Sequence, residues 1–179
     1  MNRKELTKFI AVNAILSALT VVLTIIPIPI GTLNLNLGLI PIAIAAVLYG
    51  LPGGLLVGLV NGVCVLLSPA TQGFFAINVF GTILVCLLKT GLAGVVCALV
   101  YKAIKKKNEY VGVICGTLLV PVVNNTVFIL GSLVFFNGAF GELISIFITA
   151  NFLIEFVINI LLSPSVYVVV KQYKNRKHI

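Results

Sequence analysis

The side chains that could do chemistry in this chain stand inside long apolar runs. Two of them are charged, and the others are amides: Lys89, Glu155, Asn124, Asn125, Asn151 and Asn159. If the runs cross a bilayer, a charge near its centre costs at least about 2.5–3.5 kcal/mol and therefore faces a bundle interior or a cavity. Ammonium, carboxylate and amide groups together are suited to binding a small polar molecule.

The spacing of these residues predicts one polar level. Asn151, Glu155 and Asn159 follow one another at intervals of four, so they form a stripe on one helix face. This stripe should face the spans that carry Lys89 and Asn125. At 1.5 Å per residue, Lys89, Asn125 and Glu155 all lie about 17–20 Å from the outer ends of their spans. Two interpretations remain open: a binding cavity that opens outward, and a Lys89–Glu155 ion pair that only locks the bundle.

A second group of residues, nearer the outer ends, would close such a cavity. It comes from the outer loops and the start of the fourth span: Asn34, Asn36, Gln72, Phe74, Phe75, Asn78 and Asn137. Aromatic rings with amides suit a flat, heteroatom-rich small molecule. Phe74 and Phe75 equally suit a role as anchors at the membrane interface.

The parts of a catalytic or metal site are missing from the sequence. There is no Asp, and His178 in the basic tail is the only His. Neither a Ser-His-Asp constellation nor a metal site is therefore expected. The four cysteines lie inside apolar runs without close pairing, which favours buried thiols: Cys64, Cys86, Cys97 and Cys115. We expect a protein that is not an enzyme and holds no cofactor and no metal.

The composition is that of an integral membrane protein. Of the 179 residues, 60% are hydrophobic and 9% charged, and the mean hydropathy is +1.22. A soluble domain carries about a quarter charged residues, so a soluble enzyme, a disordered chain and a nucleic-acid-binding domain are excluded. The length suits a single all-α domain over residues 1–179 with about six spans.

The net charge of +8 comes from three basic clusters. Every Lys and Arg except Lys89 lies in one of them: 3–8, 102–107 and 171–177. Basic flanks on short loops mark the cytoplasmic side. We therefore expect both termini and the middle cluster to be cytoplasmic, which requires an even number of spans between them, and we expect no nucleic-acid partner.

The apolar runs satisfy this parity. The expected spans are residues 9–30, 37–49, 53–67, 76–101, 110–136 and 143–170. The turns 31–36, 68–75 and 137–142 then lie outside, and 50–52 and 102–109 inside. A hairpin around 50–54 that does not fully cross would leave four spans with the same parity. A signal peptide is disfavoured for the first span, because its apolar stretch is long and lacks a small-residue cleavage site.

Small residues form possible helix-packing faces. Ala14 and Ala18 are four residues apart in the first span, which suits either the docking of a partner helix or packing inside the bundle. Glycines in the third and fourth spans favour internal packing: Gly54, Gly58, Gly62, Gly91 and Gly94.

Together these segments resemble the substrate-binding S components of energy-coupling factor (ECF) transporters over the whole chain. The similar features are the basic start before Ala14-xxx-Ala18, the segment 35–50 ending in Tyr49-Gly50, and the segments 78–82 and 87–94. An Asn in the fifth span, and an Asn followed one turn later by a charge in the sixth, complete the pattern.

The resemblance implies a six-helix bundle in the bacterial cytoplasmic membrane that binds a vitamin or micronutrient near its outer face. It implies docking onto a transmembrane T component, driven by two cytoplasmic ATPases, through Ala14 and Ala18. It also implies substrate binding by spans four to six with the outer loops as covers: Asn78, Asn125, Asn151 and Glu155.

The identity of the vitamin stays open. Flavin-binding members have a Lys near the position of Glu155, which argues against riboflavin here, and the chain lacks the Trp and His residues of thiamine- and nickel- or cobalt-binding members. Two other functions remain as alternatives. One is a structural or assembly subunit. The other is a stand-alone secondary carrier, although no paired repeats with broken helices are evident.

Overall fold

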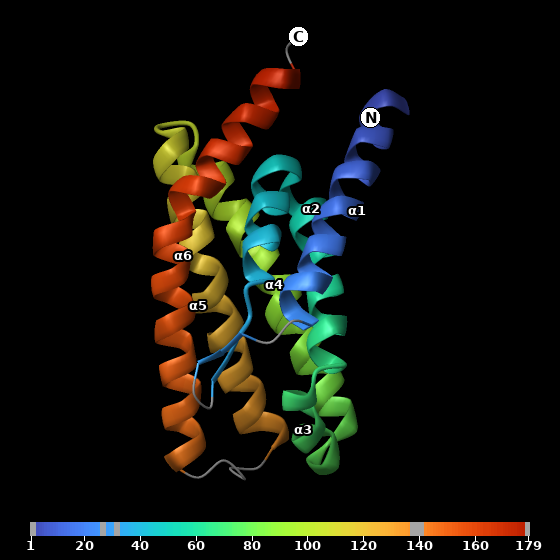
Figure 1. Ribbon diagram of the computed structural model, residues 1–179, viewed down its shortest axis with the longest axis vertical. Coiled ribbons are helices and arrows are strands. Elements are labelled where there is room, and N and C mark those ends of the chain that lie inside the picture. Colours follow the sequence, from blue (N-terminus) through green and yellow to red (C-terminus); the bar gives the residue numbers. More distant parts are fainter. Residues whose placement is uncertain (1–2, 26–27, 31–32, 137–141, 178–179) are drawn as a thin grey trace.

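The chain is a helical bundle with one short β-hairpin (Figure 1). The computed structural model describes residues 3–25, 28–30, 33–136 and 142–177, with the backbone alone for 28–30, 33–35, 70, 142–151 and 176–177. The elements in order are α1 Arg3–Ile25, β1 Ile28–Ile30, β2 Leu33–Leu35, α2 Leu39–Leu66, a 3-10 turn Pro69–Thr71, α3 Gln72–Ile77, α4 Val79–Ile104, α5 Glu109–Phe135 and α6 Glu142–Lys177. Five of the described helices are long and apolar enough to cross a membrane: α1, α2, α4, α5 and α6.

Helix α2 is folded back on itself at Gly50. Gly50 has φ 69° and ψ −148°, a conformation that glycine adopts without a Cβ penalty. A Cβ on Gly53 would lie 2.7 Å from the carbonyl oxygen of Ala45, eight residues earlier. In a straight helix residues eight apart are separated by about 12 Å. The two parts of α2, the first limb (39–49) and the second limb (51–66), are therefore antiparallel. With the limbs counted separately, the five long described helices make six helical stretches.

The two limbs reach different depths. The second limb runs antiparallel along α4, since Gly54 meets Gly94, Gly58 meets Thr90 and Gly62 meets Cys86. It thereby accompanies α4 almost to that helix's first turn. The first limb is only about 16 Å long at 1.5 Å per residue. It begins next to Asn61, because a Cβ on Gly38 would collide with the Asn61 amide.

Several expected boundaries are corrected by the structure. The first span was expected to continue to residue 30, but α1 ends at Ile25 and a strand follows, in a segment whose Pro27 and Pro29 have no backbone N–H to donate. The hairpin pairs Ile28 with Leu35 and lies at mid-height beside α6 (Figure 1), not at the end of the bundle. The fourth span begins later than expected, since Asn78 has extended backbone and separates α3 from α4. Helix α6 extends beyond residue 170, to Lys177.

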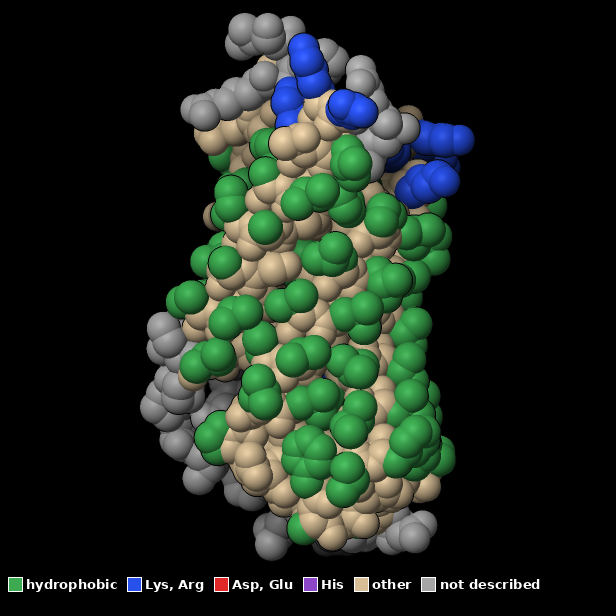
Figure 2. Space-filling model, turned by 90° about the vertical axis from the view of Figure 1, so that its right-hand side faces the viewer, with side chains coloured by type: hydrophobic (Ala, Val, Ile, Leu, Met, Phe, Trp, Pro, Cys, Tyr) green, Lys and Arg blue, Asp and Glu red, His purple; other side chains and the backbone are tan. Residues whose placement is uncertain are grey.

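The first limb of α2 forms the centre of the core. Leu39, Ile42, Ala43, Ala45 and Ala46 are all 0% exposed. A helix that is apolar on every side belongs in a bundle interior, and the first limb is surrounded by the longer helices (Figure 1). Around it, α1 packs on α2, α2 on α4, α4 on α5 and α5 on α6. On the face shown in Figure 2, apolar side chains cover the outer surface, as lipid contact requires.

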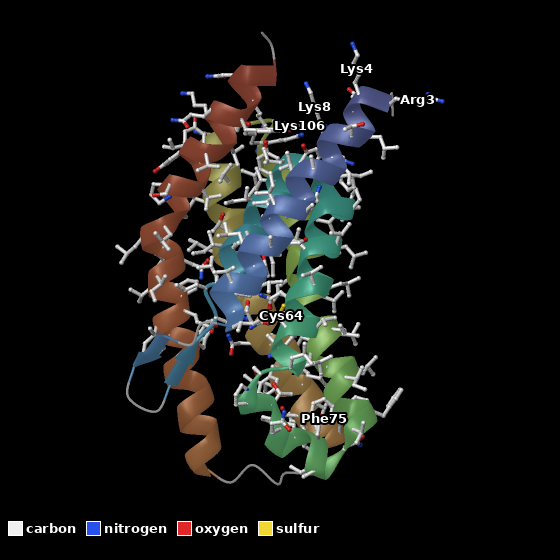
Figure 3. All side chains as sticks on the ribbon, turned by 45° about the vertical axis from the view of Figure 1, so that its right-hand side comes forward. Arg3, Lys4, Lys8, Cys64, Phe75 and Lys106 are labelled. Carbon is white, nitrogen blue, oxygen red and sulfur yellow. The ribbon has the colours of Figure 1, made fainter. Side chains whose placement is uncertain are left out.

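The three basic clusters gather at one end of the bundle, as the sequence predicts. Figure 2 shows Lys and Arg side chains only at that end of the visible face, and Figure 3 places Arg3, Lys4, Lys8 and Lys106 there. Lys174 of α6 forms an ion pair with Glu109 of α5 at this basic end. The far end, by contrast, carries α3 and the start of α4 (Figure 1).

If the basic end is cytoplasmic, cysteines introduced at the two ends will differ in accessibility. In a variant without native cysteines, Cys at position 106 should resist an impermeant thiol reagent added to intact cells. Cys in place of Gly73, where a Cβ meets nothing within 4 Å, is the matched control and should react. Labelling at 106 without labelling at 73 would show the reverse orientation.

The contact between α2 and α4 predicts which glycine tolerates a methyl group. A Cβ on Gly94 would collide with the carbonyl oxygen of Gly54, whereas one on Gly91 first meets Leu55 at 3.4 Å, an ordinary contact. Overpacking a core costs about 1–3 kcal/mol. Gly94→Ala should therefore lower the melting temperature of the purified protein, and Gly91→Ala should leave it nearly unchanged. Equal effects of the two variants would contradict the backbone contact.

Candidate binding site

A hydrogen-bonded polar node lies inside the bundle at the start of the first limb. We define it as Thr24 of α1, Asn36 before α2, and Asn61 of the second limb. The Thr24 hydroxyl donates to the Asn36 Oδ1 at 3.2 Å, and the Asn36 amide donates to the Asn61 Oδ1 at 3.2 Å. The Asn61 amide donates to the Thr24 hydroxyl at 3.0 Å. Three parts of the chain that are distant in sequence are thus joined at one point.

The node requires glycine at position 38. The Gly38 N–H donates to the Asn36 Oδ1 at 3.1 Å. A Cβ at this position would collide with the Thr24 hydroxyl and the Asn61 amide. Thr24 and Asn61 are not among the residues that the sequence pattern indicates as site residues. Asn61 could have been identified, because it is the one hydrogen-bonding side chain other than Cys64 in the apolar stretch 51–66, and it is 0% exposed.

Glu155 of α6 is connected to the node through the backbone. Its Oε1 accepts a hydrogen bond from the Asn36 N–H at 3.1 Å, and the residue is 4% exposed. The expected stripe on α6 does face inward, since Asn159 is 2% exposed as well, and its amide donates to the Glu155 carbonyl oxygen at 2.8 Å. The contact with the Asn36 loop was not expected. The side chain of Asn151, the third member of the stripe, lies outside the described residues.

Lys89 of α4 faces the bundle interior. Thr82, Val85 and Ala93, which share its helix face, are 1%, 3% and 0% exposed. Its ammonium lies over the ring of Phe128 on α5, 4.7 Å from the centroid. Such a contact contributes about 0.5–2 kcal/mol, less than the ~2.5–3.5 kcal/mol that a charge costs at this depth. Among the described residues, no carboxylate oxygen lies within the 4.0 Å of Lys89 that an ion pair requires.

Lys89 and the polar node lie at about the same level along the bundle. A Cβ on Gly62, the neighbour of Asn61, would lie 2.9 Å from the Cys86 carbonyl oxygen and 2.8 Å from the Thr90 hydroxyl. Lys89 stands between these two residues of α4. The single polar level expected from helical rise is therefore present for Lys89, Asn61 and, through Asn36, Glu155.

The two side-chain amides of α5 are both buried but differ in their hydrogen bonds. Asn125 is 9% exposed, and its amide donates to the Pro121 carbonyl oxygen at 3.1 Å. Asn124 is 6% exposed, and within the described part of the chain its Oδ1 has no hydrogen-bond partner. Buried acceptors are nearly always satisfied, so the Asn124 Oδ1 offers a place for a donor that the described residues do not fill.

The residues expected to close the site have different surroundings in the structure and do not form one group. Phe74 of α3 packs on Phe128 and Phe136, with centroids 5.6 and 5.3 Å apart, and forms an aromatic cluster. Phe75 is half-buried on α3 at the far end (Figure 3), and Gln72 is exposed. Asn78 caps α4, because its Oδ1 accepts from the Gly81 N–H at 2.8 Å. Asn137 and the Asn34 side chain lie outside the described residues.

The basic end carries a pocket of a different kind. It lies between the Gly50 turn of α2 and the last turns of α4, and Tyr101, Lys102 and Lys105 contribute to its lining. None of the side chains predicted to bind substrate lines it. It lies at the end opposite α3, so it does not replace the interior polar level as the candidate binding site.

The polar level combines one carboxylate, one ammonium group and several side-chain amides. Among the described residues, no three His, Cys, Asp or Glu side chains gather as metal ligands would. The family described as "ECF transporter, substrate-specific component" matches residues 8–167, a range that includes most of α1, all of α2 to α5 and most of α6. Neither curated proteins nor solved structures give a match. Members of this family are multi-pass membrane subunits for transport and not enzymes. The chain therefore belongs to the substrate-specific S components of ECF transporters.

Proposed function

We propose that this chain binds a vitamin or related micronutrient from the far end of the bundle and passes it inward together with a T component and two ATPases. The observation that carries the proposal is the polar level at mid-bundle, where Glu155 accepts from the Asn36 N–H and Lys89 lies at about the same height on α4, over the Phe128 ring. Glu155 and the amides are assigned to the substrate, and ATP hydrolysis to the partners.

The unfilled acceptors favour binding over a purely structural role. In a structural lock the polar atoms satisfy one another, as those of Asn61 do. The Oδ1 atoms of Asn124 and Asn159 are buried and have no hydrogen-bond partner among the described residues. Each can accept a hydrogen bond from a ligand at little further desolvation cost.

The Asn36 loop is suited to closing over the substrate. The Asn36 N–H donates a hydrogen bond to Glu155, and the Asn36 side chain forms hydrogen bonds with Thr24 and Asn61. A ligand that changes the hydrogen bonding of Glu155 would thereby also affect the loop between α1 and α2. Substrate binding would in this way be coupled to α1, the helix assigned to partner docking.

The surface of α1 supports docking onto a T component. Ala14 and Ala18 are exposed, whereas Asn13, Leu16 and Thr20 on the opposite side of the helix are buried. The small residues therefore do not serve packing within the described bundle. In lipid, a face of small side chains lets another helix approach closely, which favours association by van der Waals contact.

Glu155→Gln tests the binding site. Gln keeps an oxygen that can accept from the Asn36 N–H but removes the charge, so ligand-free melting should change little. Hydrogen bonds to charged groups contribute about 1.5–3 kcal/mol, so the affinity for the substrate should fall about tenfold or more. A thermal-shift screen against a vitamin panel identifies the substrate, and titration gives the affinity of each variant.

Glu5→Gln, at an exposed position in the first turn of α1, is the matched control and should bind normally. Normal affinity in Glu155→Gln would remove Glu155 from the site. If no vitamin shifts the melting temperature and none copurifies, the structural alternative replaces the transport proposal.

Two bulky substitutions test the docking face. Ala14→Trp with Ala18→Trp should abolish vitamin uptake in cells while substrate binding to the isolated protein persists, because the T component can no longer approach. Leu130→Trp with Leu133→Trp enlarges exposed positions on α5 and should leave uptake intact. Loss of folding and binding in the α1 variant would place the two alanines in an internal contact instead.

A further inference from the structure

The described part of the chain presents a cation at mid-bundle whose charge it does not neutralise. Lys89 lies on the interior face of α4, at the level of Cys86 and Thr90, which contact the second limb of α2. The sequence places every other basic residue in the three clusters at the basic end. Lys89 therefore does not belong to the basic clusters that are expected to set the orientation of the chain in the membrane.

Lys89 is half-buried, and the contact that it makes with the protein compensates the cost of this partial burial only in part. The ammonium lies over the Phe128 ring at 4.7 Å, and no carboxylate oxygen of the described residues is within ion-pair distance of it. A ring face attracts a cation but does not neutralise it. An ammonium group in a low-dielectric interior is best stabilised by an anion whose oxygen atoms accept its hydrogen bonds.

We infer that the substrate is a small organic acid whose carboxylate binds Lys89 and whose N–H or O–H group donates to Glu155, with an apolar body that packs against the aromatic cluster of Phe74, Phe128 and Phe136. This inference rests on the proposed function and names the class of substrate. A single ammonium group neutralises a single negative charge, so a carboxylate matches it better than a doubly charged phosphate. The cluster extends from Phe128 beside Lys89 to α3 at the far end, which places the apolar body on the side where the substrate would enter.

Matched pairs of compounds test the charge requirement. The probes are nicotinate with nicotinamide, pantothenate with pantothenol, and biotin with biotinamide, together with uncharged riboflavin and pyridoxine and cationic thiamine. At pH 7 we expect one acid to raise the melting temperature and its neutral counterpart to have at least a tenfold weaker affinity. A shift by riboflavin, pyridoxine or thiamine, or equal binding of an acid and its neutral counterpart, would overturn the inference and leave the proposed function standing. No shift by any compound would reject both.

Variants at position 89 identify the residue that reads the charge. Lys89→Met should weaken binding of the acid tenfold or more and leave that of the neutral counterpart unchanged, so the preference disappears. Lys89→Arg, which keeps the charge, should retain the preference even if affinity falls. Lys102→Met at the basic end is the matched control and should bind as the unmodified protein does. An undiminished preference for the acid in Lys89→Met would refute the assignment.

Discussion

The fold-back of α2 at Gly50 sets the constraint on which the interior depends. Because the first limb covers only about half the hydrocarbon depth, the chain enters it through a loop at mid-bundle. Backbone N–H groups at that depth cannot be satisfied by water and need partners within the protein. Glu155 accepts from the Asn36 N–H, and the Asn36 side chain accepts from Gly38 and Thr24. The short limb thus explains why polar residues from α1, α2 and α6 converge on one level.

Close backbone packing between α2 and α4 fixes the position of the polar level in the bundle. The second limb meets α4 at Gly54 and Gly94 with no side chain between them, so the two helices are fixed in register. The other side of the bundle is different, because α1 packs mainly on α2 and leaves its small-residue face exposed. The interior is closely packed, whereas one face of α1 has no neighbour among the described helices. This arrangement is consistent with a subunit that holds a substrate on one side and presents a docking surface on another.

The polar groups of the interior fall into two sets. Those of the node are satisfied within the protein and stabilise the loop, and Asn78 likewise serves as the cap of α4. Lys89 and the carbonyl oxygen of the Asn124 side chain retain binding capacity toward the bundle interior. Under the function proposed above, this second set would be available to the substrate.

Much of the fold follows from the sequence alone. Composition determined the membrane class, and the basic clusters determined that both termini share an end. The interval of four between Gly54, Gly58 and Gly62 predicted packing inside the bundle, and the structure shows that the partner is α4. Helical rise placed Lys89 and Glu155 at one depth. Only the tertiary structure decided their partners: Glu155 contacts the Asn36 backbone, Lys89 contacts Phe128, and Asn61 enters the node. The physical reason is that periodicity fixes the height and face of a residue on its own helix. A hydrogen bond or ring contact depends instead on the rotation of neighbouring helices and on the path of a loop, which packing sets.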